Sequence, residues 1–236
     1  MVRVALQLSG RLRYTNESIS SMMASIIEPN QPDIFCSFWE PENRDAIGNL
    51  ISYLHPTVVE IEDQTMIRPY LDDLFRFNVH ANMPSMSYKF HRVASLRRAH
   101  ELRNGFNYDV IIQARADNVF FEPLKAQVGL VVGQTGIWCS NGSVNENIDP
   151  YISPRMVDNF YLGDRSSVDI ASSTFWYLKK QCEDWTSEDK LHHVRIPEII
   201  QSKIWNDLGI KIRPLPGSNP FNNFYYDIDR RETPWR

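Results

Sequence analysis

The architecture follows from the stretch Tyr108-Asp109-Val110-Ile111-Ile112-Gln113-Ala114-Arg115-Ala116-Asp117-Asn118. This is an apolar run of strand length that ends in a charged Arg-x-Asp tip. Open α/β sheets bind ligands beyond the carboxyl ends of their strands, so we expect a ligand site at this tip. Because side chains alternate between the two faces of a strand, Arg115 and Asp117 should point to the same side.

Upstream of this stretch, strand-like and helix-like segments alternate. The strand candidates are residues 2–8, 33–39 and 57–61. The helix candidates run from Thr15 to Ile27, from the end of Glu40-Pro41-Glu42 to about Tyr53, and over residues 85–104. Strands that alternate with helices predict an α/β fold with a mostly parallel sheet flanked by helices. Segment 65–83 is poorly periodic and prolines stand at positions 69 and 84, so we expect mostly loop there.

The downstream half lacks this regular alternation of strand-like and helix-like segments. Strand candidates lie at 136–140 and 209–212, residues 157–163 are another short apolar segment, and a polar loop rich in Asn, Gly and Pro covers 141–155. Residues 166–182 and 187–208 read as helices, and Pro197 must either open a new helix or kink the second one. The tail from 214 to 236 is rich in proline and aromatic residues and is expected to wrap the surface. We expect one domain over residues 1–236.

Composition excludes several classes of protein. The formal net charge is only -4 and the chain has no basic block, so nucleic acid is not an expected partner. No segment approaches the roughly 20 apolar residues of a membrane span. Three widely separated cysteines without CxxC spacing indicate neither a disulfide framework nor a zinc site. We therefore expect a protein of a reducing compartment, the cytoplasm.

Five pieces in order carry a family resemblance: residues 4–13, 33–35, 85–89, 108–117 and 158–160. Over roughly residues 2–213 the chain resembles GT-A-type glycosyltransferases of bacterial and large-virus polysaccharide pathways. The resemblance implies a GT-A-like, Rossmann-like fold. It also implies a nucleotide-diphosphate-sugar donor bound by residues 1–120 and a glycan acceptor bound by residues 121–213. Transferases of this type hold a divalent metal through Asp-x-Asp, and here Arg115 replaces the first carboxylate.

The resemblance places the donor site after the first strand and at the Arg-x-Asp tip. The residues implied are Leu8, Ser9, Gly10, Arg11, Arg13, Lys89, Arg115 and Asp117, with Asp117 as the anchor of a Mn²⁺ or Mg²⁺ ion. Gly10 permits a close backbone approach or a positive φ, and guanidinium groups recognise phosphate in a planar, bidentate way. Arg115 and Asp117 could instead form a buried ion pair, and Lys89, Arg11 and Arg13 could be solvated.

An inverting transferase needs a carboxylate base beside the acceptor hydroxyl. Asp158 is the first candidate and Glu198 the second, although Asp158 could cap a turn and Glu198 could complement a helix dipole. A retaining enzyme would not need such a base. The adjacent His192 and His193 do not share a helix face, which argues against zinc. Aromatic residues at 175–177 and 221–226 could stack on sugars or serve as core.

Two rival classes remain open. A nucleotidyltransferase would normally show a Gly-rich signature with a lysine after the first strand, and residues 9–13 lack it. A catalytically silent nucleotide-sugar or glycan-binding module would explain the missing first carboxylate. A binding module holds nucleotide without turnover, whereas a transferase slowly hydrolyses its donor.

Overall fold

The computed structural model describes residues 2–41, 44–77, 82–141, 156–187, 197–215 and 226–228. A seven-stranded sheet in the order β3-β2-β1-β4-β7-β6-β8 runs through it, and β5 pairs with β9 in a second sheet. The strands are β1 (Val4–Arg11), β2 (Asp33–Trp39), β3 (Val58–Glu62), β4 (Val110–Ala114), β5 (Asn118–Phe120), β6 (Ile137–Asn141), β7 (Met156–Gly163), β8 (Ile212–Pro214) and β9 (Tyr226–Ile228).

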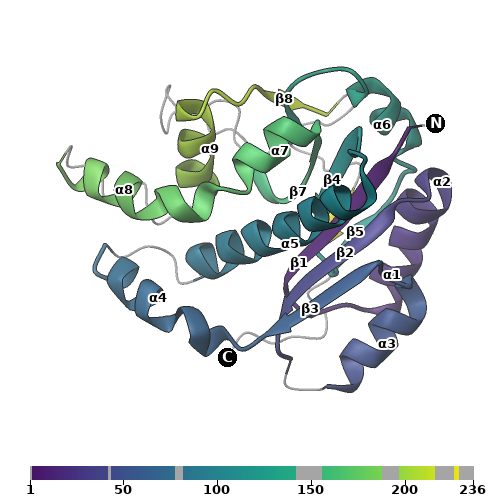
Figure 1. Ribbon diagram of the computed structural model, residues 1–236, viewed down its shortest axis with the longest axis horizontal. Helices are drawn as coiled ribbons and strands as arrows, with labels where there is room; N and C mark the ends of the chain where they lie inside the picture. Colours follow the sequence, from purple (N-terminus) through teal and green to yellow (C-terminus); the bar gives the residue numbers. More distant parts are fainter. Residues whose placement is uncertain are drawn as a thin grey trace.

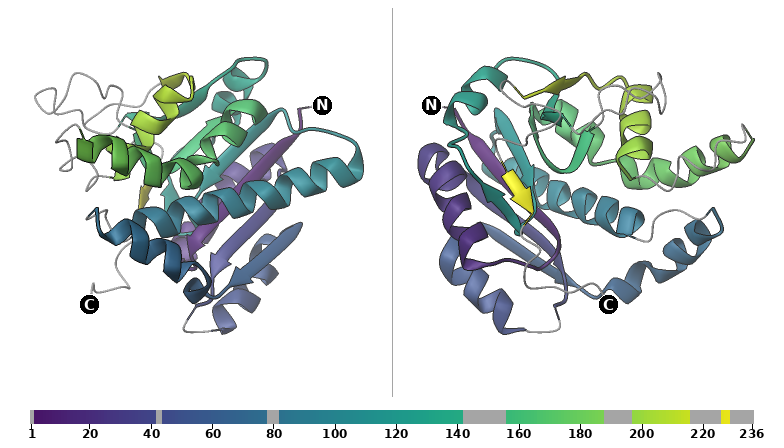
Figure 2. Two further views of the ribbon diagram at one scale, coloured as in Figure 1. Left: turned by 60° about the vertical axis from the view of Figure 1, so that its left-hand side comes forward. Right: turned by 180° about the vertical axis from the view of Figure 1, so that it is seen from behind.

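Helices cover both faces of the large sheet (Figure 1). They are α1 (Asn16–Met22), the π-helical η1 (Met23–Ile27), α2 (Glu28–Asn30), α3 (Asp45–Leu54), the 3-10 helix η2 (Gln64–Ile67), α4 (Arg68–Phe75), α5 (Asn82–Asn104), α6 (Lys125–Val131), α7 (Arg165–Ala171), α8 (Thr174–Ser187) and α9 (Pro197–Asp207). Figure 2 shows α1, α2 and α3 on one side of the sheet and α5, α7, α8 and α9 on the other. Each side has its own apolar core.

The first four sheet strands confirm the predicted parallel arrangement. Strand β1 pairs in parallel with β2 and β4, and β2 pairs in parallel with β3. Beyond β4 the sheet is mixed, because β7 is antiparallel to both β4 and β6 while β8 runs parallel to β6. The chain therefore has an α/β fold with a mostly parallel sheet flanked by helices, as its sequence predicts.

Thr15 caps the first helix as expected. Its hydroxyl accepts from the Ser18 N–H, while the Ser18 hydroxyl accepts from the Thr15 N–H, which forms a reciprocal capping box. The predicted helix to Ile27 is continuous in space but changes from α-helical to π-helical geometry at Met23.

The expectation of loop over residues 65–83 is wrong. Residues 64–67 form η2, residues 68–75 form α4, and α5 already begins at Asn82. Pro69 and Pro84 both lie in the first turn of a helix, where the backbone N–H that proline lacks would have no intrahelical partner. These prolines start helices rather than break them.

The downstream half matches the sequence predictions in part. The predicted helix over 166–182 is two helices, α7 and α8. Pro197 is the first residue of α9, and residues 188–196 of the helix predicted over 187–208 lie outside the described residues. The predicted last strand lies later, at Ile212–Pro214. The tail is not wholly irregular, because β9 adds to β5. His192, His193 and residues 221–225 lie outside the described residues.

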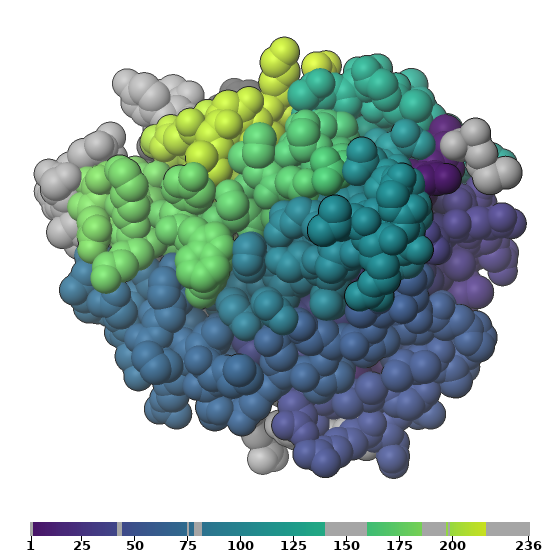
Figure 3. Space-filling view, viewed as in Figure 1, coloured from purple at the N-terminus to yellow at the C-terminus, as the bar shows by residue number. Residues whose placement is uncertain are grey.

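Helices α4, α5 and α8 form one continuous surface on the face shown in Figure 3. Phe175 of α8 is buried beneath this surface against Tyr70 and Tyr88, whereas Trp176 and Tyr177 are exposed. Of the aromatic run 175–177, only Phe175 therefore belongs to the core.

Candidate functional site

The sheet face beneath α5 changes from apolar to polar along the parallel strands. Near the amino ends of the strands it presents Ala5, Phe35 and Ile111 to the core under α5. Toward the carboxyl ends, period-two alternation brings polar groups and one tryptophan to this face: Gln7 and Ser9 on β1, Ser37 and Trp39 on β2, Glu60 and Glu62 on β3, and Gln113 on β4. The carboxyl edge is thus the polar edge, which is where open α/β sheets place their ligand sites.

Strands β1 and β4 lie at the point where the strand order reverses. Strands β2 and β3 extend the sheet to one side of β1, and β4 begins the extension to the other side. Leu8 of β1 pairs with Ala114, the last residue of β4. Side chains that follow these two strands therefore meet at the switch point, which is the preferred ligand position in doubly wound sheets.

Arg115 and Asp117 form a bidentate ion pair at this point. The Arg115 Nε donates to Asp117 Oδ1 at 2.7 Å and Nη2 donates to Oδ2 at 2.5 Å. The Arg115 backbone N–H donates to Asn118 Oδ1 at 2.7 Å. Asp117 is only 5% exposed. The structure contains the ion pair that was one of the two predicted arrangements, but a turn over residues 115–118 after β4, rather than strand alternation, brings the two side chains together.

Two more arginines reach the same place from β1. Burial and the positive charge of Arg11 lower the pKa of Arg13, Arg115 lowers it further, and Asp117 raises it, so all three charges act on Arg13. Within the described part of the chain, no carboxylate lies within ion-pair distance of Arg11 or Arg13. We call Arg11, Arg13 and Arg115 the arginine cluster. Among the described side chains, the cluster places three cations near one carboxylate, and this excess of positive charge favours binding of an anion.

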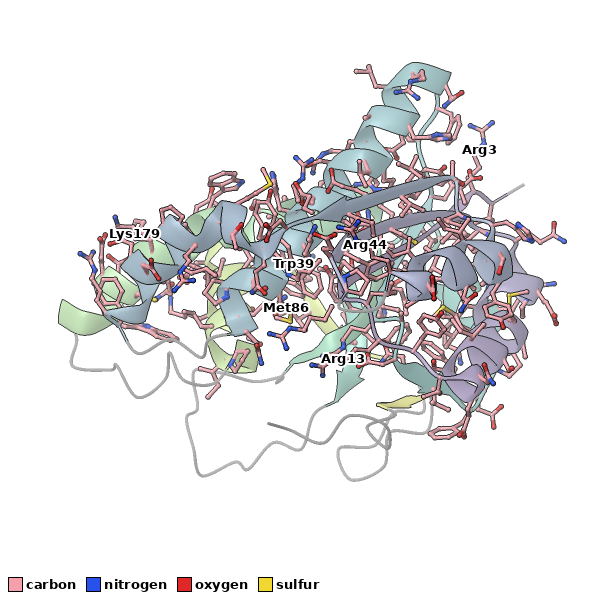
Figure 4. The ribbon with its side chains drawn as sticks, turned by 90° about the horizontal axis from the view of Figure 1, so that it is seen from below. Arg3, Arg13, Trp39, Arg44, Met86 and Lys179 are labelled. Carbon is pink, nitrogen blue, oxygen red and sulfur yellow. The ribbon has the colours of Figure 1, made fainter. Side chains whose placement is uncertain are left out.

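Figure 4 shows Arg13 in the same central region of the molecule as Trp39 of β2 and Met86 of α5. These residues come from the carboxyl ends of two strands and from the first turns of the helix that covers them. The arginine cluster is therefore bordered by the polar edge of the sheet.

Gly10 lies within β1 rather than just past it, which corrects the predicted position. Its φ is 109°, in the region that side-chain-bearing residues rarely adopt, and an added Cβ would meet no atom within 4 Å. The need for glycine is thus conformational rather than steric. The predicted positive φ is confirmed, and it sets the direction in which the chain leads to Arg11 and Arg13.

Lys89 lies at the edge of the site but is not solvated, so that alternative is wrong. Its side chain is fully buried, and Nζ donates to Glu62 Oε2 at 2.7 Å and to Ser37 Oγ at 3.3 Å. The same Nζ lies 4.2 Å from the centre of the Trp39 ring, and the Tyr88 ring stacks on Trp39. Burial lowers the pKa of Lys89, and the pair with Glu62 opposes that shift.

Glu60 and Arg92 extend this cluster toward solvent. Arg92 pairs with Glu60 and lies 3.5 Å from Glu62, and the Ser37 hydroxyl donates to Glu60 Oε1 at 2.9 Å. Burial favours the protonated form of Glu60, but the hydrogen bonds from Arg92 and Ser37 outweigh it and leave the pKa of Glu60 below its usual value. The two carboxylates are thus neutralised by Lys89 and Arg92.

The remaining predicted site residues are placed as follows. Leu8 is fully buried in the core on the opposite face of the sheet, and Ser9 accepts from Gln113 Nε2 at 2.9 Å through its hydroxyl. Asp158 belongs to the first part of β7, which runs antiparallel to β4 and therefore begins near the carboxyl end of β4. Glu198 is the second residue of α9. The side chains of Asp158 and Glu198 lie outside the described part of the structure.

A divalent ion at Asp117 does not fit the side chains around it. Both Asp117 oxygens and the Asn118 side-chain oxygen already accept from Arg115. Within the described ranges, no three histidine, cysteine, aspartate or glutamate side chains are grouped to hold a metal ion. Like unit charges about 4 Å apart near a protein surface repel by about 4 kcal/mol, and a doubly charged ion beside Arg115 would double that figure.

Sequence reasoning missed Glu60, Glu62 and Trp39. The signal was present, because Glu60 and Glu62 alternate at the end of a strand in the same way as Arg115 and Asp117. Applying the period-two argument to residues 58–62 would have placed both carboxylates on one face at the carboxyl edge.

No protein-family model and no curated protein matches the chain. Solved structures with a similar chain path include mouse xyloside xylosyltransferase 1 in its apo form (9% identity, 91% of this chain, 84% of that chain, TM-score 0.45). A cytidylyltransferase from Leptospira borgpetersenii (10% identity, 93% and 78% coverage, TM-score 0.45) is also similar. So is the glycosyltransferase GlyE of Streptococcus pneumoniae (13% identity, TM-score 0.45), where the match covers 92% of this chain and 46% of that chain. At these identities the likeness concerns the α/β fold alone.

Proposed function

We propose that this chain is a glycosyltransferase that moves a sugar from a nucleotide-diphosphate donor to a glycan acceptor. The observation that carries the proposal is the arginine cluster at the β1–β4 switch point, where Arg115 pairs with Asp117 at the end of β4 and Arg11 and Arg13 lie at the end of β1. A diphosphate matches this cluster in charge, and the switch point is where sheets of this class bind nucleotides. The resemblance of the sequence to GT-A-type transferases supports the same reading.

The arginines would act on the leaving group. As the bond between the anomeric carbon and the β-phosphate oxygen breaks, its electron pair moves to that oxygen. Guanidinium groups fixed around the diphosphate stabilise this growing charge, and prearranged positive groups of this kind contribute most of the catalysis in many transferases. Lys89 borders the donor side of this proposal as a positioning residue, because its ammonium is paired with Glu62 at the polar edge.

The acceptor hydroxyl forms the new bond and must lose its proton. We assign that proton to the Asp158 carboxylate in an inverting reaction, with Glu198 as the second candidate. In a retaining reaction Asp158 would position the acceptor instead. Its place at the beginning of β7, near the end of β4, supports either role.

We propose that the protein works in a reducing compartment such as the cytoplasm. Cys36, Cys139 and Cys182 are buried thiols that form no disulfide, and burial raises the pKa of Cys36 to about 12, so this thiol stays protonated and inert. In the described part of the chain, no helix combines the length and apolarity needed to cross a bilayer.

The test is donor turnover measured as release of nucleoside diphosphate from UDP-, GDP- and dTDP-sugars. We predict slow hydrolysis of one donor without acceptor. Asp158→Asn should bind that donor with unchanged affinity but lose transfer to acceptor glycans by at least about 100-fold, the usual scale of a lost general base. Asp207→Asn, at the exposed end of α9, is the matched control and should keep full activity.

Two outcomes would contradict the proposal. Full transfer by the Asp158 variant would dismiss this residue as the base. Tight nucleotide binding without turnover of any donor would instead favour a silent binding module, for which the Arg115–Asp117 ion pair in place of two metal-binding carboxylates is the supporting observation.

A further inference from the structure

We infer that the arginine cluster holds the diphosphate of the donor without a divalent ion. Asp117 then serves as a positioning residue that orients Arg115 rather than as a metal ligand. This inference rests on the proposed function, because it concerns how the same donor is bound.

The first argument is the occupancy of the oxygens that a metal would need. Both Asp117 oxygens accept from Arg115, Oδ1 from Nε at 2.7 Å and Oδ2 from Nη2 at 2.5 Å. The Asp117 side chain is 7% exposed, so the carboxylate of the pair is buried. The side-chain Oδ1 of the neighbouring Asn118 accepts from the Arg115 backbone N–H at 2.7 Å. The oxygens at this tip are therefore arranged around a guanidinium group.

The second argument is charge balance. Among the side chains that the structure describes here, the three arginines carry three positive charges and Asp117 carries one negative charge, which leaves a net charge of two positive units. The diphosphate of a nucleotide sugar carries two negative charges, so the cluster neutralises it without further help. A divalent ion would leave the site with a surplus of two positive units.

The third argument is the origin of the cations. Arg11 ends β1, Arg13 follows it and Arg115 follows β4, so the cations come from the carboxyl ends of two neighbouring parallel strands. Arg11 is exposed and Arg13 is partly buried, and neither lies within ion-pair distance of a described carboxylate. A planar guanidinium can hold two phosphate oxygens at once, which suits a diphosphate better than a point charge would.

The ion pair with Arg115 explains why the Asp117 carboxylate can be buried. A buried charge is tolerated when it is paired and hydrogen-bonded. Arg115 supplies the pairing, and the bidentate geometry fixes the plane of the guanidinium group. Asp117 therefore limits the directions in which Arg115 can face the donor.

The experiment is calorimetric titration of the full chain with UDP and GDP, each in EDTA and in Mn²⁺. We predict that the dissociation constant of the preferred nucleotide changes less than threefold between EDTA and Mn²⁺. Arg13→Gln should weaken binding at least tenfold in both buffers, and Arg13→Lys should restore part of it. Arg3→Gln, at the opposite end of β1, is the control and should bind like the unmodified protein.

Asp117→Asn separates the two roles of that carboxylate. An asparagine still accepts a hydrogen bond from Arg115 but removes one negative charge, so nucleotide affinity in EDTA should stay within about threefold. A shallower salt dependence of binding in Arg13→Gln, measured between 50 and 300 mM NaCl, is the readout that loss of structure alone would not give. Circular dichroism and the melting temperature check that each variant is folded.

The contrary results are distinct from failure of the proposed function. Binding that requires Mn²⁺ and disappears in EDTA or in Asp117→Asn would overturn the metal-free site and leave the glycosyltransferase proposal standing. Absence of nucleotide binding in both buffers would overturn the proposed function itself.

Discussion

At the scale of single residues, Gly10 is a position where backbone conformation rather than lack of space favours glycine. With φ at 109° and open space around an added Cβ, Gly10→Ala should cost about 1–3 kcal/mol in unfolding free energy through backbone strain. Gly129 of α6 also has open space around an added Cβ, so Gly129→Ala should stabilise by about 0.5–1 kcal/mol. Urea denaturation measures both, and equal effects would refute the strain at Gly10.

Single residues also show what the sequence could predict. The Arg115–Asp117 pair was one of two arrangements predicted, although a turn after β4 rather than strand alternation forms it, and a positive φ was one of the two roles expected of Gly10. The burial of Lys89 was not predictable, because its partner Glu62 is 27 positions away and the ring beneath it, Trp39, comes from a third element. Contacts between distant segments are not contained in a local pattern.

At the scale of elements, α5 links the site to the far end of the sheet. Lys89 and Arg92 on its first half pair with carboxylates at the end of β3. On its second half Arg97 is fully buried and pairs with Glu101 of the same helix and Asp169 of α7. The prediction of loop over residues 65–83 was wrong at this scale. In a sequence, a proline in the first turn of a helix cannot be distinguished from a proline that ends a helix.

Helix α7 supplies a prediction about pH. Asp164 accepts from the N–H groups of Ser166 and Ser167 as N-cap and from the Gly136 N–H next to β6. Burial favours its protonated form, but the hydrogen bonds outweigh burial and leave the pKa of Asp164 below its usual value. Its contribution is therefore present above the unfolded-state pKa of about 3.9 and is lost as pH falls through the folded-state value.

Asp164→Ala should accordingly lower the unfolding free energy by about 1–2 kcal/mol at pH 7, with a difference from the unmodified protein that shrinks toward pH 3. Urea denaturation from pH 3 to pH 7 measures this. Asp207→Ala removes only a surface pair with Lys203 and should cost about 0.5 kcal/mol or less. A difference at Asp164 that grows on acidification would contradict the cap.

At the scale of the whole molecule, the two halves differ in how well the sequence predicts them. The first half alternates strand and helix, and right-handed crossovers then leave little choice of topology, so its parallel order β3-β2-β1-β4 was predictable. In the second half, strand direction depends on which neighbour each strand finds. The antiparallel β7 and the pairing of the short β5 with β9 from the tail are set by tertiary contacts alone.

The central claim is that the switch point between β1 and β4 binds a nucleotide-diphosphate sugar. The most direct test is a thermal-shift panel of UDP-, GDP-, dTDP- and CMP-sugars on the unmodified protein and on Arg13→Gln. At 100 times its dissociation constant a ligand stabilises by about 2.7 kcal/mol, which raises the melting temperature of a domain of this size by about 5–10 °C. We predict such a shift with one diphosphate donor, none with the monophosphate CMP-sugar, and its loss in Arg13→Gln. No shift with any donor, or an unchanged shift in Arg13→Gln, would contradict the claim.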